Sequence, residues 1–162
     1  VGRVTVLTGA GVDPEAFAVR ALPALPPLKM ILVARMVRSK GVDLAVDALT
    51  LARRAGVYAT LTLVGDGDPA NPGSYDANEL VAFAAARGVH LLGRRTDIAD
   101  LLADHHAFIL PSRGGEGLPR ALLEAAATAV PCPLASVMRR RPHRSAVRGS
   151  RIPRSHRSAI SC

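Results

Sequence analysis

One strand–loop–helix unit decides the fold of this chain: Ala107-Phe-Ile-Leu-Pro-Ser-Arg-Gly-Gly-Glu-Gly-Leu-Pro-Arg-Ala-Leu-Leu-Glu-Ala-Ala-Ala127. The apolar start predicts a strand, and the end predicts a helix over 118–127 with Pro119 in its first turn, where a missing N–H costs nothing. Such a loop directs unpaired backbone N–H groups and the positive end of a helix dipole towards the carboxyl edge of a sheet. This arrangement suits an anion, above all a phosphate.

Two carboxylates flank this expected anion site. Glu116 stands in the loop, and Glu124 stands in the helix, roughly 7 to 8 Å along the axis from Pro119 at about 1.5 Å per residue. A ligand with a diphosphate between two hydroxylated rings would suit this layout. A sugar nucleotide is such a ligand.

Strands and helices alternate through the rest of the chain. Apolar runs predict strands over 30–34, 59–64, 89–92 and 106–110, and helical spacing predicts helices over 42–56, 78–87, 98–103 and 118–127. The alternation predicts an α/β fold, a Rossmann-like parallel sheet with helices on both faces, incomplete at its C-terminal end. Ligands on such sheets bind beyond the carboxyl ends of the strands. We therefore expect the turns that follow the four strands to share one edge of the sheet.

Two cations follow the first of these strands. Arg35 and Lys40 precede the helix predicted over 42–56, where positive charge opposes the helix dipole, so an external anion is their expected partner. Arginine offers phosphate a forked contact and lysine a point charge. The alternative is that both are solvated surface cations.

These residues belong to an ordered series: Arg35 and Lys40-Gly41, Val64-Gly-Asp-Gly67, Leu92-Gly93, Pro111-Ser112, Glu116-Gly-Leu-Pro119 and Glu124. The series resembles the C-terminal, donor-binding domain of the retaining GT-B glycosyltransferases of family 4. Those enzymes carry two glutamates with seven residues between them, as this chain does. The segment 9–17 is similar to the family's inter-domain segment, and the resemblance covers roughly residues 4–128.

The resemblance implies a role for each matching residue. Arg35 and Lys40 would bind the donor diphosphate and stabilise the leaving group, and Glu116 would contact the sugar, which makes these three the expected catalytic residues. Glu124 would hold the ribose hydroxyls, and the turn after Gly93 would lie near the base. The full set of expected donor-binding residues is Arg35, Lys40, Gly65, Gly93, Glu116, Gly117, Leu118 and Glu124.

Family members transfer a sugar from a nucleotide-diphosphate sugar to an acceptor hydroxyl with retention and without a catalytic metal. The resemblance therefore implies no cofactor, and a leaving-group charge met by side chains and a helix dipole. Asp66 and Asp68 form an Asp-x-Asp pair, but turn chemistry in a Gly-rich loop accounts for them better than a metal does. The adjacent His105 and His106 would diverge in a strand, so they are poor chelators.

The net charge of +8 comes entirely from the end of the chain. Residues 1–132 contain 13 Lys/Arg and 13 Asp/Glu, whereas residues 133–162 contain eight Arg and no acid. A tail of this kind binds polyanions non-specifically, but it lacks aromatic residues for base stacking, so no specific nucleic-acid contact is expected. Our hypothesis is that the tail is an aberrant, frameshifted continuation; the alternative is a genuine basic extension.

The expected organisation has three parts: an inter-domain segment and linker over 1–29, a nucleotide-sugar-binding domain over 30–128, and a basic, disordered tail over 129–162. The chain does not start with Met, so we expect it to begin inside a longer polypeptide, without the N-terminal acceptor domain. The isolated chain should then have little or no transferase activity. The alternatives are a stand-alone nucleotide-binding module of a split transferase and a polyanion-binding protein that acts through its tail.

The compartment is predicted from what the sequence lacks. It shows no signal peptide and no apolar run long enough for a transmembrane segment, and its two cysteines form no motif. These observations indicate the cytoplasm.

Overall fold

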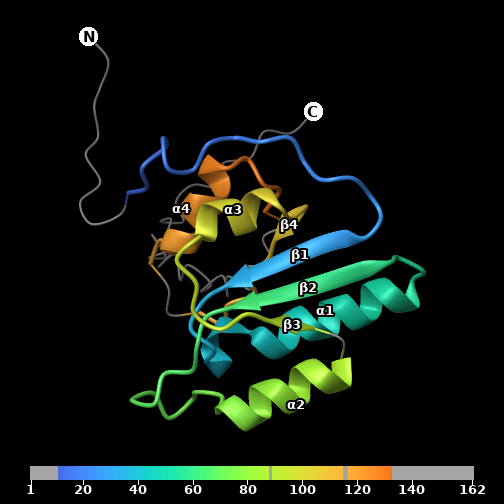
Figure 1. Cartoon of the computed structure of the whole chain (residues 1–162). Helices are drawn as coiled ribbons and strands as arrows, with labels where there is room; N and C mark the ends of the chain where they lie inside the picture. The colour runs from blue at the N-terminus through green and yellow to red at the C-terminus, as the bar shows by residue number, and fades with distance from the viewer. Residues whose placement is uncertain (1–10, 88, 115–116, 133–162) are drawn as a thin grey trace, which may run out of the picture.

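Four parallel strands form the sheet of the protein, whose computed structural model describes residues 11–87, 89–114 and 117–132 (Figure 1). The strands are β1 (Leu28–Val33), β2 (Ala59–Val64), β3 (His90–Leu91) and β4 (Ala107–Phe108), in the order β3-β2-β1-β4. All three pairings are parallel. The predicted α/β fold with a Rossmann-like parallel sheet is therefore confirmed.

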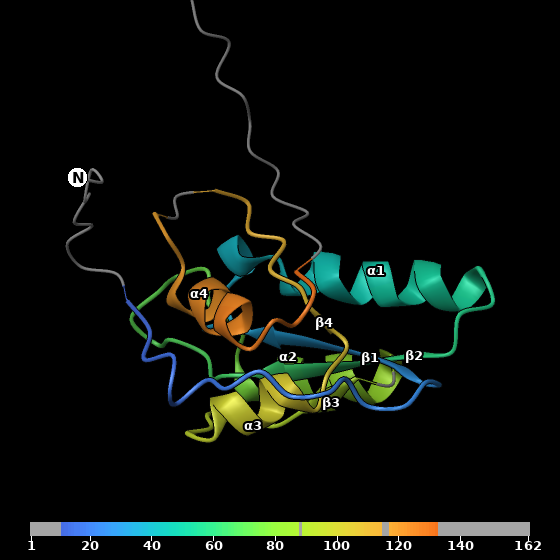
Figure 2. The same ribbon diagram turned by 90° about the horizontal axis from the view of Figure 1, so that it is seen from above.

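Helices cover both faces of this sheet, as predicted (Figures 1 and 2). Helices α1 (Val42–Arg54) and α2 (Ala77–Arg87) lie on one face, and α3 (Ile98–Ala103) and α4 (Arg120–Ala127) lie on the other. A short 3-10 helix, η1 (Arg38–Lys40), precedes α1. None of the helices in the described ranges is long and apolar enough to cross a membrane.

The central strands are buried on both faces, because side chains alternate between the two layers of helices. On β1, Leu32 packs into the core under α1 and α2, whereas Ile31 packs with Phe108 and Leu102 into the core under α3. All four side chains are at most 1% exposed. This two-sided burial explains why the strands read as nearly continuous apolar runs.

The two edge regions differ in length from the prediction. Strands β3 and β4 each span two residues rather than the predicted 89–92 and 106–110. Pairing continues beyond them through single backbone bonds, from Leu92 N–H to Leu63 O (3.0 Å) and from Ile109 N–H to Ile31 O (2.9 Å). A single hydrogen bond of this kind lets the backbone continue in the direction of the strand, but it does not add a residue pair to the sheet. His90, in β3, is exposed at the sheet edge.

Residues 129–132 pack on the sheet although the sequence placed them in the basic tail. Val130 is 3% exposed in the core under α3 and α4, and Phe108 donates its N–H to Pro131 O at 2.9 Å. The buried Val130 side chain and the Pro131 carbonyl beside β4 therefore make this segment part of the folded domain. The predictions for residues 133–162 fall outside the described residues.

Candidate functional site

The turns that follow the four strands meet at the carboxyl edge of the sheet. Four backbone hydrogen bonds connect them: Ala34 N–H to Val64 O (3.0 Å), Met36 N–H to Asp66 O (2.8 Å), Gly65 N–H to Gly93 O (2.8 Å) and Arg113 N–H to Ser39 O (2.8 Å). Each turn therefore fixes the position of its neighbour. The shared edge predicted from the alternating pattern is present.

Two glycines allow these turns to approach closely. Gly41 has φ +71°, and a Cβ at that position would lie 2.1 Å from Pro111 O. Gly65 has φ +135°, and a Cβ there would lie 1.9 Å from Ala34 O. Only glycine combines a positive φ with contact between two backbones. The expected binding residue Gly65 thus has a clear role in shaping the turn.

Arg35 and Lys40 lie on the same turn, between β1 and α1. The Arg35 side chain is 62% exposed, and its Nη1 donates to Asp68 Oδ2 at 2.5 Å. Lys40 ends η1 and is half-buried next to Gly41, which contacts Pro111. The structure therefore brings both predicted cations to the joined turns.

Arg113 is a component of this edge that the sequence analysis missed. Its Nη1 and Nη2 donate to the two carboxylate oxygens of Asp43 at 2.7 and 2.5 Å, and Nη1 also donates to Arg38 O at 2.7 Å. The hydrogen bond from Arg113 is the main cause that lowers the pKa of the Asp43 carboxyl. Arg113 thus fastens the loop after β4 to the turn after β1. No sequence signal pairs two residues 70 positions apart.

Arg38 is a second missed residue on the same turn. Its guanidinium lies 4.6 Å from the centroid of the Tyr75 ring, and Nη2 donates to Glu79 Oε1 at 3.1 Å. Burial is the main cause that raises the pKa of the Tyr75 hydroxyl. These contacts hold the start of α2 against the turn after β1.

Glu124 lies on the buried side of α4. The residue is 8% exposed, and its Oε1 accepts from Arg120 Nε at 2.8 Å. The helix begins at Arg120 rather than at residue 118, because Pro119 has an extended ψ of 127° and serves as the N-cap. Gly117 and Leu118 precede it and are exposed. Glu116, the expected catalytic carboxylate, lies outside the described residues.

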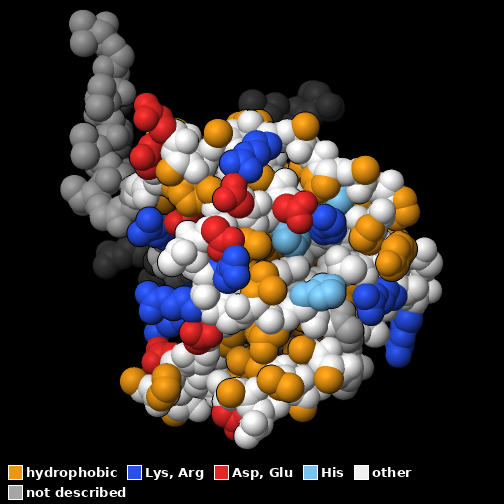
Figure 3. Space-filling model, in the orientation of Figure 1, with side chains coloured by type: hydrophobic (Ala, Val, Ile, Leu, Met, Phe, Trp, Pro, Cys, Tyr) orange, Lys and Arg blue, Asp and Glu red, His pale blue; other side chains and the backbone are white. Residues whose placement is uncertain are grey.

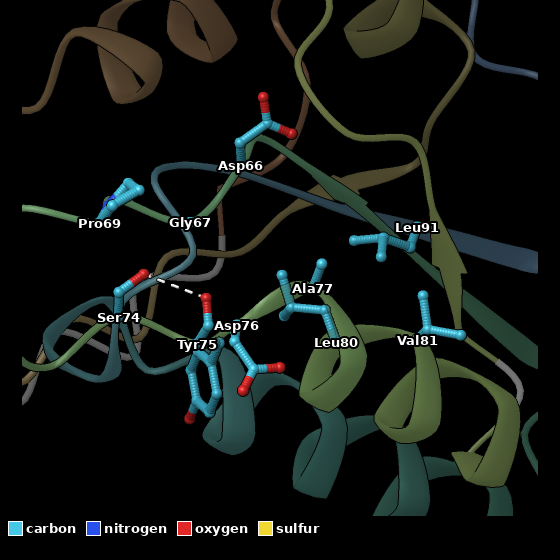
Figure 4. Close-up of a pocket in the computed structure, with 10 residues that line it drawn as sticks. All are labelled: Asp66, Gly67, Pro69, Ser74, Tyr75, Asp76, Ala77, Leu80, Val81 and Leu91. Atoms are coloured by element: carbon cyan, nitrogen blue, oxygen red, sulfur yellow. Dashed lines mark hydrogen bonds between the residues drawn. The ribbon is translucent and has the colours of Figure 1, made fainter.

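A cavity of about 510 Å³ opens beside the turn after β2 (Figure 4). Leu80, Val81 and Leu91 give it an apolar lining, and Asp66 and Asp76 also border it. Its remaining lining residues are Gly67, Pro69, Ser74, Tyr75 and Ala77. The cavity thus borders the joined turns on the α2 side.

Asp66 and Asp68 have separate structural partners. Asp66 Oδ1 accepts from Arg94 N–H at 3.0 Å, whereas the Asp68 carboxylate accepts from Arg35. Within the described ranges no group of three or more His, Cys, Asp or Glu could hold a metal ion.

The adjacent histidines have structural contacts. His105 Nε2 lies 2.8 Å from Thr62 Oγ1, and burial lowers the pKa of the His105 ring. His106 Nδ1 accepts from Lys29 N–H at 3.0 Å. Both rings are therefore engaged at the amino-terminal side of β4 and do not form a chelating pair.

Charges of both signs are interspersed on the face of the protein seen in Figure 3. The exposed ion pairs of the described residues include Arg95–Asp97 (2.6 Å) and Arg20–Asp100 (2.8 Å). The view agrees with the equal numbers of acidic and basic residues over 1–132.

Comparison with known proteins gives one matching family. The family described as "Glycosyl transferases group 1" matches residues 27–143, which is most of the chain. The match begins one residue before β1 and includes all four strands and all four α-helices.

Curated relatives are longer than this chain. The amylovoran biosynthesis glycosyltransferase AmsK of Erwinia amylovora is 31% identical over 139 residues, a region that covers 77% of this chain and 32% of the relative. The UDP-Gal:alpha-D-GlcNAc-diphosphoundecaprenol alpha-1,3-galactosyltransferase of Escherichia coli is 35% identical over 79 residues, covering 49% and 20% respectively. The chain therefore spans about a third or less of the length of these relatives.

A solved structure shows the same fold. The Anabaena protein HepE, determined in complex with UDP and glucose, superposes with a TM-score of 0.59 at 22% identity. The match covers 75% of this chain and 35% of HepE.

Proposed function

Because this chain belongs to the group 1 glycosyl transferase family, we propose that it supplies the donor site of a retaining, family 4 glycosyltransferase with a GT-B fold. The reaction moves a sugar from a nucleotide-diphosphate sugar to an acceptor hydroxyl. One observation carries the proposal: the turns after β1, β2, β3 and β4 are bonded together at one edge of the sheet, with Arg35 and Lys40 among them.

Arg35 and Lys40 bind the diphosphate of the donor. The Arg35 guanidinium is largely exposed, so it can turn towards a phosphate, and arginine forms forked contacts with phosphate oxygens. The N-terminus of α4 lies near the carboxyl end of β1 in both ribbon views (Figures 1 and 2). Its dipole and the Gly117 and Leu118 backbone add further stabilisation for the anion.

The same groups stabilise the leaving diphosphate as the bond to the sugar breaks. Negative charge develops on the leaving group, and fixed cations and N–H groups aimed at it lower the barrier. We propose that no metal ion is needed for this step. Glu116 contacts the donor sugar.

The two rings of the nucleoside are held by different residues. Glu124 accepts hydrogen bonds from the ribose hydroxyls, in place of or beside its present donor, Arg120 Nε. The base lies near the turn after Gly93, which is fixed by its bond from Gly65 N–H.

The acceptor is bound by residues beyond this chain. The match covers only 32% of the relative AmsK, and GT-B enzymes react in a cleft between two domains. We therefore propose that this chain binds donor but transfers little sugar by itself, and that it acts in the cytoplasm.

Calorimetric titration with UDP, GDP and ADP tests the proposal. Arg35→Ala should weaken binding of every diphosphate, whichever base it carries. Arg54→Ala is the matched control, because Arg54 is also exposed but ends α1, at the opposite edge of the sheet. Equal affinity of the parent and Arg35→Ala for all three nucleotides would rule out the proposed site.

A further inference from the structure

The loop between β2 and α2 carries a carboxylate in a fixed position. Asp68 N–H donates to Ser74 Oγ at 2.7 Å, and Asn71 N–H donates to Asp68 O at 2.8 Å. Gly73 N–H donates to Asn71 Oδ1 at 2.9 Å, and this bond closes the next turn. The backbone on both sides of Asp68 is therefore held by the loop itself.

This loop is also docked on the turn that carries Arg35. Arg38 N–H donates to Gly73 O at 2.8 Å, and Tyr75 N–H donates to Met36 O at 3.0 Å. The contacts bring the carboxylate of one segment to the guanidinium of the other, 33 residues apart in sequence.

The two partners of this ion pair differ in exposure. The Asp68 side chain is 23% exposed and its Oδ1 also accepts from Ala70 N–H at 3.2 Å, whereas the Arg35 side chain is 62% exposed. Arg35 is thus the partner that can move towards a ligand in solvent, and Asp68 is the partner that stays in place.

We propose that Asp68 sets the affinity of the site for diphosphates by competing with them for Arg35. The inference rests on the proposed donor-binding role of Arg35. A diphosphate that approaches this guanidinium meets a carboxylate of the same sign, and like charges at contact with one cation repel each other. After transfer, the same carboxylate regains Arg35 and favours release of the nucleoside diphosphate.

Titration of the full chain with inorganic pyrophosphate and UDP tests this competition. Asp68→Asn should bind both ligands about two- to five-fold more tightly, the effect expected of one exposed ion pair. Asp104→Asn is the control, since it changes the net charge equally but pairs with Lys29 (3.0 Å) at the opposite edge of the sheet. An equal gain in Asp104→Asn would assign the effect to net charge and overturn the proposal.

A second background separates this inference from the proposed function. With Arg35→Ala already present, Asp68→Asn should give no further gain, because the two residues act as a coupled pair. If Arg35→Ala weakens binding but the affinity of Asp68→Asn is equal to or lower than that of the parent, the proposed competition is wrong and the proposed donor site stands. If Arg35→Ala has no effect, the donor site itself fails.

Discussion

Replacing Gly41 by alanine tests the contact between the turns after β1 and β4. The residue has φ +71°, and the added Cβ would lie 2.1 Å from Pro111 O and 2.9 Å from the Pro111 carbonyl carbon. The left-handed backbone costs alanine about 1 kcal/mol. The contact with a backbone atom cannot be relieved by a side-chain rotation, so overpacking adds roughly 1–3 kcal/mol. We expect Gly41→Ala to lose about 3 kcal/mol of unfolding free energy.

Gly56→Ala is the matched control for this prediction. Gly56 has φ +84°, but a Cβ there meets nothing within 4 Å, so only the backbone cost of about 1 kcal/mol applies. Urea denaturation followed by circular dichroism measures both losses. Equal losses in the two variants would refute the close approach of Gly41 to Pro111. Titration with UDP should also show weaker binding by Gly41→Ala but not by Gly56→Ala. The Cβ added at position 41 pushes the turn that carries Lys40 away from Pro111.

Two further predictions concern charge. Arg113 lowers the pKa of the Asp43 carboxyl below its ordinary value of 3.8 in the folded chain. The stability that this pair contributes is therefore present above pH 3.8 and is lost as the pH falls through the lowered pKa. The difference in unfolding free energy between the parent and Asp43→Asn should shrink in acid, and a difference that stays constant with pH would contradict the pairing. Deleting residues 133–162 removes eight Arg and no acid. Salt-dependent retention of the protein on heparin should then be lost, while its circular dichroism spectrum keeps the helical signal. Undiminished retention would place the polyanion-binding site elsewhere in the chain.

The sheet could be predicted from the sequence because its determinants are local. Buried strands with helices on both sides read as apolar runs, and the helices reveal themselves through spacing and their closing residues. The predicted helix over 98–103 and strand over 59–64 agree with α3 and β2. Strands β3 and β4 were predicted too long, because the length of a strand depends on its pairing partners rather than on local sequence.

The candidate site was predictable only in part. Its location followed from the topology, and Arg35 and Lys40 followed from their place after the first strand. The partners of these residues did not follow: Arg35–Asp68 and Arg113–Asp43 join segments 33 and 70 residues apart, and nothing in a single sequence couples them. The burial of Glu124 likewise depends on how α4 rotates onto the sheet.

Amide chemical shifts of the ¹⁵N-labelled chain during titration with UDP report where the nucleotide binds. A donor site at the carboxyl edge of the sheet predicts that the largest changes fall together on the four joined turns, at Arg35 to Gly41, Gly65 to Gly67, Gly93 to Arg94, and Ser112 to Leu118. Changes confined to residues 133–162, or scattered over the amino-terminal edge of the sheet, would contradict a donor site at the carboxyl edge.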